Sequence, residues 1–172
     1  AVESTGLWSD SRIYSLNSYE NRVYQIGIEG GSPVIAKFYR PDRWSKAQIL
    51  EEHSLLLKLQ VAGVPIVAPL AFEGKSLFCH KGIYFCLSPR LIGQHPEADN
   101  LDQLYQLGEL IGQVHKEMLA VPFSERISVS PLMQMDQATS QILSHNFLPE
   151  KLKPLYKKQI NKLRGMSEAS IK

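Results

Sequence analysis

The chain has little of several features that would place it in a specialised class. Only two cysteines, Cys79 and Cys86, occur among its 172 residues, which argues against a disulfide framework and suits a reducing compartment. No apolar run approaches the length of a membrane span, and residues 1–12 lack the basic and apolar segments of a signal peptide. The formal net charge of +2 is too small to favour nucleic acid or an anionic membrane. We therefore expect a cytoplasmic protein with no nucleic-acid and no membrane partner.

The composition that is present is typical of a globular protein. Hydrophobic residues make up 44% of the chain and charged residues 21%. A chain of 172 residues is long enough to bury a substantial core as one domain or as two small ones.

The order of predicted elements divides the chain into a mostly β part and a helical part. Alternating apolar patterns and turn residues predict strands and one helix in the first part. The expected strands are Arg12–Leu16, Arg22–Glu29, Val34–Tyr39, Val67–Phe72 and Ile83–Leu87, with a helix from a capping box at Ser45 and Gln48 to about Gln60. Helical patterns follow over residues 101–119, 134–143 and 151–163. The change in composition near Pro89–Pro96 predicts an α+β protein with one unit at residues 1–92 and a second at 93–172.

The strand "VIAKFY" contains a lysine among apolar and aromatic residues. Alternation places Ile35, Lys37 and Tyr39 on one face, and the opposite face is apolar throughout. An ammonium in such surroundings needs an anionic partner or a path to water. Lys37 therefore either pairs with a carboxylate or runs along an edge strand to solvent.

A carboxylate with a similar anomaly lies in the helix that follows. At 100° per residue, Glu52 falls inside the apolar sector, whereas Glu51 falls on the polar side. The sector consists of Ile49, Leu55, Leu56 and Leu59. We predict a Lys37–Glu52 ion pair inside the unit, of the kind that marks a place for an anion. The alternative is that Glu52 lies at the rim of the sector and reaches solvent.

Two loops are candidate ligand-binding segments. The loop "NSYEN" joins the first two strands and could offer backbone N–H groups to a phosphate, although it has no glycine and could equally be a plain hairpin turn. The segment "YFCLSPRLIG" leads from the last strand into the helical part, where a ligand crevice is favoured. Pro89 offers a C=O and Leu91 both a C=O and an N–H, which suits an adenine, but a plain linker explains the same residues.

In this order, the elements resemble the small lobe of a protein-kinase-like fold. "VIAKFY" and the fifteen-residue step from Lys37 to Glu52 are similar to the kinase lysine strand and its paired glutamate. "LGELIGQVH" resembles a helix of the aminoglycoside phosphotransferase and choline kinase branch. "LNSYENRVYQI", "KFYRPDRWSKAQILEEH", "PIVAPLAF" and "PEADNLDQL" are similar to the bacterial stress response kinase A family. The resemblance is dense from about Val2 to His115 and thin afterwards.

The resemblance implies a function and a set of site residues. It implies an ATP-dependent Ser/Thr protein kinase that acts on a protein substrate; the alternatives are an aminoglycoside- or choline-type small-molecule kinase and a non-catalytic binding module. Lys37 would position the ATP phosphates and Glu52 would orient Lys37. The other implied ATP-binding residues are Ser18, Tyr19, Glu20 and Asn21 over the phosphates, Ile35 and Leu87 beside the adenine, and the Pro89 C=O and Leu91 N–H at its edge.

One departure from the family is large. The family's "HGD" loop and "D-x-D" metal motif are missing, because none of the five histidines is followed by Gly-Asp. We therefore expect residues 1–172 to be an N-terminal portion of a longer kinase, inactive alone, with the ligands for Mg2+ beyond Lys172 and neither a catalytic residue nor a metal site within it. The histidines show no metal-ligand spacing. Bare helical surface in the second part predicts association through those helices.

Overall fold

The computed structural model describes residues 1–127, 130–145 and 147–170. Two compact units, Ala1–Arg126 and Ile127–Lys172, are described separately. In the first unit the helices and strands are η1 (Val2–Thr5), β1 (Ser9–Leu16), β2 (Arg22–Ile28), β3 (Val34–Phe38), α1 (Lys46–Val61), β4 (Phe78–His80), β5 (Ile83–Pro89) and α2 (Leu101–Leu119). The second unit contains α3 (Pro131–Ser144), the 3-10 helix η2 (Glu150–Leu152) and α4 (Lys153–Ser170).

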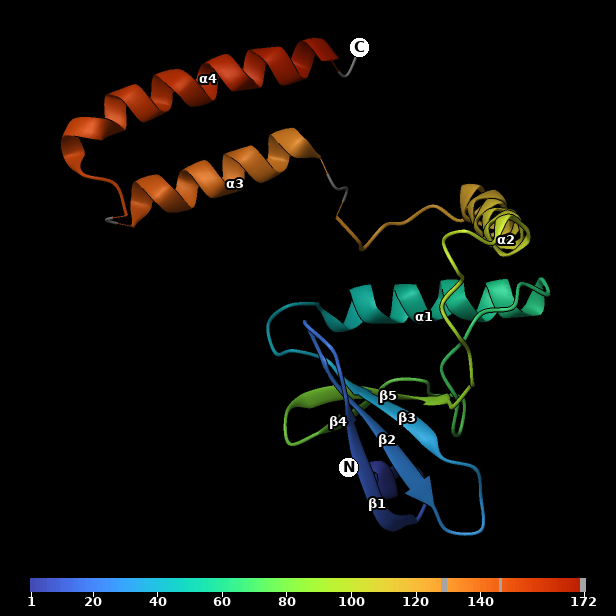
Figure 1. The fold of residues 1–172 in the computed structure, drawn as a ribbon. Helices are drawn as coiled ribbons and strands as arrows, with labels where there is room; N and C mark the ends of the chain where they lie inside the picture. The colour runs from blue at the N-terminus through green and yellow to red at the C-terminus, as the bar shows by residue number, and fades with distance from the viewer. Residues whose placement is uncertain (128–129, 146, 171–172) are drawn as a thin grey trace. The chain divides into compact units, whose positions relative to one another are not determined.

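The strands of the first unit form one antiparallel sheet. Among the described residues it has five strands in the order β1-β2-β3-β5-β4 (Figure 1). The turn between β2 and β3 uses Gly30 at a φ of 65°, and that between β4 and β5 uses Gly82 at 80°, conformations that glycine adopts without strain. The register places Lys37 between Val23 of β2 and Cys86 of β5. The predicted α+β class is confirmed.

One face of the sheet carries the main hydrophobic core. Its buried members are Val2, Ile26, Ile28, Val34, Ala36, Phe85 and Leu87. Phe85 stacks on Phe38 with ring centroids 5.3 Å apart, and η1 adds Val2 from the N-terminus. The alternation predicted for β3 is confirmed, because Val34 and Ala36 both belong to this cluster.

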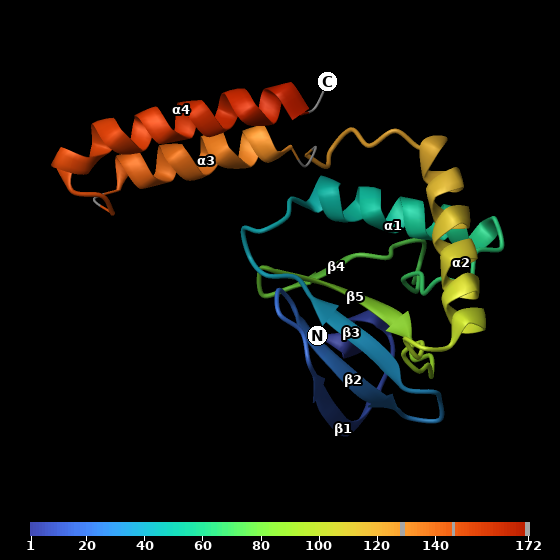
Figure 2. The ribbon, with the colours of Figure 1, turned by 45° about the horizontal axis from the view of Figure 1, so that its top comes forward.

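Helix α1 lies against the opposite face of the sheet (Figure 2), where its Glu52 pairs with Lys37. The predicted capping box is present: the Gln48 N–H donates to Ser45 Oγ, and the Ser45 N–H donates to Gln48 Oε1. Ile49 packs with Tyr39 and Cys86 of the sheet. On its other side α1 meets α2, where Leu110, Val114 and Met118 pack against Leu55, Leu59 and Val64.

The strand predicted at Val67–Phe72 is wrong. The structure forms no strand there; Leu70 N donates to Leu87 O at 2.7 Å, and Phe72 forms a single bridge with Lys75. Pro69 has no N–H, so this segment cannot maintain a continuous ladder. The strand beside β5 is instead β4, from the "SLFCH" segment that the sequence analysis left unassigned.

The helical segments expected after Gly93 are confirmed as α2, α3 and α4. In the second unit, Arg164 Nη1 donates to Asp136 Oδ1 at 2.8 Å, which joins α4 to α3. The compact units divide after Arg126 rather than at residue 92, because α2 packs on α1. The lobe boundary at 92/93 stays a prediction about the longer kinase fold. In the described ranges, no helix is both long and apolar enough to cross a membrane.

Candidate functional site

Lys37 and Glu52 meet as predicted. Lys37 Nζ lies 3.3 Å from Glu52 Oε1 and 4.6 Å from the ring centroid of Tyr39, over which it sits. Their side chains are 31% and 27% exposed, so the pair is half-buried rather than enclosed in the core. The placement of Glu52 inside the apolar sector is correct, because Ile49, Leu55 and Leu59 around it are buried. The Lys37 side chain therefore remains partly open to solvent, from which an anion can approach it.

Glu52 has a second cationic partner, Arg126, that no local pattern predicts. Arg126 Nη2 donates to Glu52 Oε2, and Arg126 Nε donates to Gln48 O at 3.3 Å. The guanidinium lies 4.4 Å from the ring centroid of Trp44, in cation–π geometry. Lys37, Arg126 and Glu52 together carry two positive charges and one negative charge, which favours a bound anion.

Glu51 lies on the polar side of α1, as the helical pattern predicts, but its carboxylate is occupied by the segment after α2. Its carboxylate accepts from Ser124 N at 2.6 Å, Ser124 Oγ at 3.1 Å, Glu125 N at 3.0 Å and Arg126 N at 2.8 Å. Desolvation alone would raise the pKa of Glu51, but the three backbone N–H groups and the hydroxyl lower it to about 2. Periodicity within α1 cannot reveal partners more than seventy residues further along the chain.

A buried polar chain lies behind Lys37. His53, only 2% exposed, hydrogen-bonds through Nε2 to Tyr39 Oη at 2.8 Å and through Nδ1 to Ser76 Oγ at 2.9 Å. Burial lowers the pKa of His53 and raises the pKa of Tyr39, so both side chains are neutral near pH 7. Burial also raises the pKa of the Cys86 thiol, whose Sγ lies 3.5 Å from Tyr39 Oη. These hydrogen bonds between neutral side chains hold the Tyr39 ring in place beneath the Lys37 ammonium.

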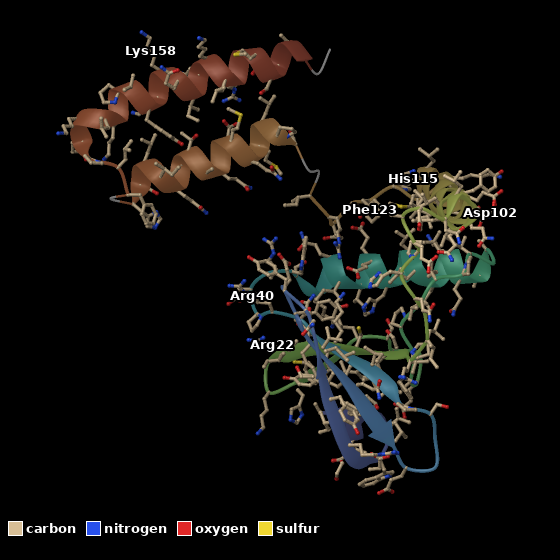
Figure 3. The ribbon with its side chains drawn as sticks, in the orientation of Figure 1. Arg22, Arg40, Asp102, His115, Phe123 and Lys158 are labelled. Atoms are coloured by element: carbon tan, nitrogen blue, oxygen red, sulfur yellow. The ribbon has the colours of Figure 1, made fainter. Side chains whose placement is uncertain are left out.

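The loop between β1 and β2, which is predicted to cover the phosphates, is held by residues that follow β3. Arg43 donates to both carboxylate oxygens of Glu20 at 3.3 Å, and Arg40 N donates to Asn21 Oδ1 at 3.4 Å. Figure 3 shows Arg22 and Arg40 where β2 begins and β3 ends. Tyr19, at the tip, is fully exposed, and Ser18 is partly buried. The loop ends at Asn21, two residues before Val23. Because Val23 pairs with Lys37, the loop lies close to the lysine along the sheet.

The face of the sheet that carries Lys37 also presents apolar side chains. Register and alternation place Leu16 and Val23 in the row of Lys37, and Tyr14 and Gln25 in the row of Ile35. Leu16 and Tyr14 are exposed. Leu16 and Val23 could not be predicted as neighbours of Lys37, because their position depends on pairing between strands.

The structure does not bring all the predicted adenine residues together. Leu87 pairs with Ala36, is 0% exposed and belongs to the core on the opposite face, so it does not lie beside Ile35. The β5 residues on the Lys37 face are Cys86 and Ser88. Pro89 ends β5, and the exposed Leu91 follows it. The face of the sheet on which Leu87 lies could be predicted from the sequence only if the pairing register of β5 with β3 were known.

The described residues contain no group of three or more His, Cys, Asp or Glu side chains that could hold a metal ion. The site combines two cations that share the Glu52 carboxylate with neighbouring apolar side chains, which suits a phosphorylated ligand with a planar base. The positions of the Mg2+ ligands stay a prediction.

The sequence matches the model of the phosphotransferase enzyme family over residues 14–155. The serine/threonine protein kinase RdoA of Salmonella typhimurium is 44% identical over 126 residues, which are 73% of this chain and 38% of that protein. Stress response kinase A of Escherichia coli (strain K12) is 46% identical over 116 residues, 67% of this chain and 35% of that protein. The chain therefore spans less than two fifths of the length of these relatives, and the predicted resemblance is confirmed.

Two solved structures share the fold. The amicoumacin kinase hAmiN in complex with AMP-PNP, Ca2+ and Ami has a TM-score of 0.62 at 20% identity, covering 84% of this chain and 52% of that one. A microcompartment-associated aminopropanol kinase has a TM-score of 0.52 at 21% identity, covering 63% of this chain and 36% of that one. At these identities the likeness concerns the fold alone, and it agrees with the predicted kinase-like sheet and helix.

Proposed function

Because the chain belongs to the phosphotransferase enzyme family, we propose that it is the nucleotide-binding part of an ATP-dependent Ser/Thr protein kinase. The observation that carries the proposal is the half-buried Lys37–Glu52 pair, which lies beside the loop between β1 and β2. A stable fold does not require a charge pair at this position, since such pairs contribute little to stability. An ammonium that a carboxylate keeps in place and open to solvent is suited to hold a phosphate.

The proposed roles follow from the position of each group. Lys37 binds the α- and β-phosphates, and Glu52 keeps its ammonium in place. The backbone of Ser18–Asn21 closes over the phosphates, supported by the contacts of Glu20 and Asn21 with Arg43 and Arg40. ATP supplies the phosphoryl group that is transferred.

The base has an apolar surface on the same face. We propose that it lies against Leu16, Val23 and Ile35, with the Pro89 C=O and the Leu91 N–H at its edge. Leu87 is left out of this set because it belongs to the opposite face. The Mg2+ ions that neutralise the phosphates would take their ligands from residues beyond Lys172.

A protein acceptor is favoured over a small molecule by the names of the relatives. The relatives at 44–46% identity are named serine/threonine protein kinase and stress response kinase. The two solved neighbours are named for small-molecule acceptors, and at 20–21% identity they support the fold only. A cytoplasmic location belongs to the same proposal and is supported by the two free cysteines.

The proposal is tested by Lys37→Ala in the complete protein that contains these residues. Phosphate transfer from labelled ATP to a Ser/Thr protein substrate should fall about 10³-fold or more, because the phosphates lose their positioning cation. The melting temperature should change little, since Lys37 is half-buried and outside the main core. Unchanged turnover would exclude the assigned role.

Two controls sharpen that test. Lys75→Ala removes an exposed lysine of the same unit, from the turn that joins Phe72 to Lys75, and it should leave turnover unchanged. The 172-residue chain alone should transfer no phosphate, because the catalytic loop is expected beyond its end; robust activity would contradict this expectation. Label on an aminoglycoside or amino alcohol rather than on protein would favour the small-molecule alternative.

A further inference from the structure

Arg126 contacts the site from a segment outside the sheet and α1. The segment that follows α2 and carries Phe123 runs back over α1 (Figure 3), where residues 124–126 bind the side chains of Glu51 and Glu52. Arg126 is 74 residues beyond Glu52 in the sequence, and its side chain is 26% exposed. The Lys37–Glu52 pair is thus in contact with the segment after α2.

The two oxygens of Glu52 are divided between two cations. Oε1 faces Lys37 at 3.3 Å, and Oε2 accepts from Arg126. A partly exposed Lys–Glu pair by itself contributes roughly 0–1 kcal/mol and restrains the carboxylate weakly. A second charge-assisted bond at the other oxygen limits rotation of the carboxylate about its terminal torsion.

Arg126 is itself held on several sides. Trp44 lies under the guanidinium, Gln48 O accepts from Nε, and Glu51 accepts from the backbone N–H. Gln48 Nε2 also donates to Glu125 O at 3.0 Å. A guanidinium with this many fixed partners has one preferred position, which is what a positioning group requires.

We infer that Arg126 is a positioning residue of this kinase: it holds the Glu52 carboxylate so that Oε1 faces Lys37. The inference rests on the proposed function of Lys37. In this arrangement the position of the Lys37 ammonium depends on the segment after α2 as well as on α1. The sequence pattern had connected Lys37 with α1 alone. Small displacements of a positioning group reduce turnover more than they reduce substrate binding.

A double-mutant cycle in the complete protein tests the inference. Arg126→Gln should lower kcat by about 10- to 100-fold and change KM for ATP by less than about threefold. In the Glu52→Gln background, Arg126→Gln should lower kcat by less than about threefold further, because the group through which it acts is gone. Additive effects, or a kcat unchanged by Arg126→Gln, would overturn the inference.

A conservative variant keeps the test valid if Arg126→Gln fails to fold. Arg126→Lys retains the charge but loses the planar fork, so kcat should fall while the melting temperature stays close to that of the parent. Wild-type kcat in a folded Arg126→Lys protein would count against the role. Arg12→Gln is the matched control, since Arg12 pairs with Asp10 on exposed β1 and should not affect kcat.

The outcome for Lys37→Ala separates the two proposals. If Lys37→Ala is inactive while Arg126→Gln is fully active, only the role of Arg126 is wrong. If Lys37→Ala is fully active, the proposed function itself fails, whatever Arg126→Gln does.

Discussion

On one face of the sheet, apolar side chains from η1, β2, β3 and β5 form a closed cluster, and Phe85 and Leu87 are fully buried there. The other face carries Lys37, the exposed Leu16 and Tyr14, and the carboxylate of Glu52 from α1. The same strands supply both faces, because alternate residues point to opposite sides. One face therefore supplies the main apolar core, and the other holds the charged groups of the site.

The charged groups extend this contrast to the two neighbouring glutamates. Glu51 is saturated by four donors from residues 124–126, whereas Glu52 shares its oxygens between Lys37 and Arg126. One carboxylate anchors a segment of chain, and the other faces the proposed ligand. Adjacent residues of one helix thus have different tasks because they point in different directions.

Phe85→Ala should produce the largest effect, and on the closed face only. Phe85 is fully buried; its ring stacks on that of Phe38 and packs at a tilt against that of Phe78, with centroids 5.3 and 5.5 Å away. The free energy of unfolding should fall by about 3–5 kcal/mol, because transfer and cavity costs add. Urea denaturation followed by tryptophan fluorescence measures this, since Trp8 and Trp44 are both in the first unit. A loss of less than about 1 kcal/mol would show that this face is not the stabilising one.

Leu16→Ala should have a smaller effect, on the face of the sheet that carries Lys37. The side chain is exposed in the free protein, so the melting temperature should change little. Affinity for AMP-PNP should fall by about three- to tenfold, since a base packed on Leu16 loses roughly 1 kcal/mol of apolar contact. Isothermal titration measures the affinity, with Ile28→Ala on the closed face as control. Ile28→Ala should lower stability and leave affinity in the folded protein unchanged; the opposite pattern would reverse the roles of the two faces.

The smallest effect is a change in how stability depends on pH. It concerns the hydrogen-bonded side chains of Tyr39, His53 and Ser76. Because burial lowers the pKa of His53 below its usual 6.5, the unfolded chain takes up a proton at a higher pH than the folded chain. Stability that is complete above pH 6.5 should therefore decrease as the pH falls toward the folded pKa. His53→Gln should flatten this dependence between pH 7 and 5, as measured by urea midpoints. A parallel dependence in both proteins would assign it to other groups.

Local patterns predicted much of this first unit. The β1–β3 hairpins, the capping box that begins α1 and the face on which Glu52 lies all depend on residues close in sequence. The false strand at Val67–Phe72 has an apolar composition but includes Pro69, and β4 was missed since a three-residue strand carries almost no periodicity.

Residue order alone identified a charged side chain on an apolar strand and another in the apolar sector of the next helix, and so it pointed to Lys37 and Glu52. The packing of the folded chain was needed to show that Leu87 faces the core, that Leu16 and Val23 lie in the row of Lys37, and that Arg126 shares Glu52. The physical reason is that side-chain alternation is a property of one strand. Register and contacts across 74 residues depend instead on how separate elements pack together.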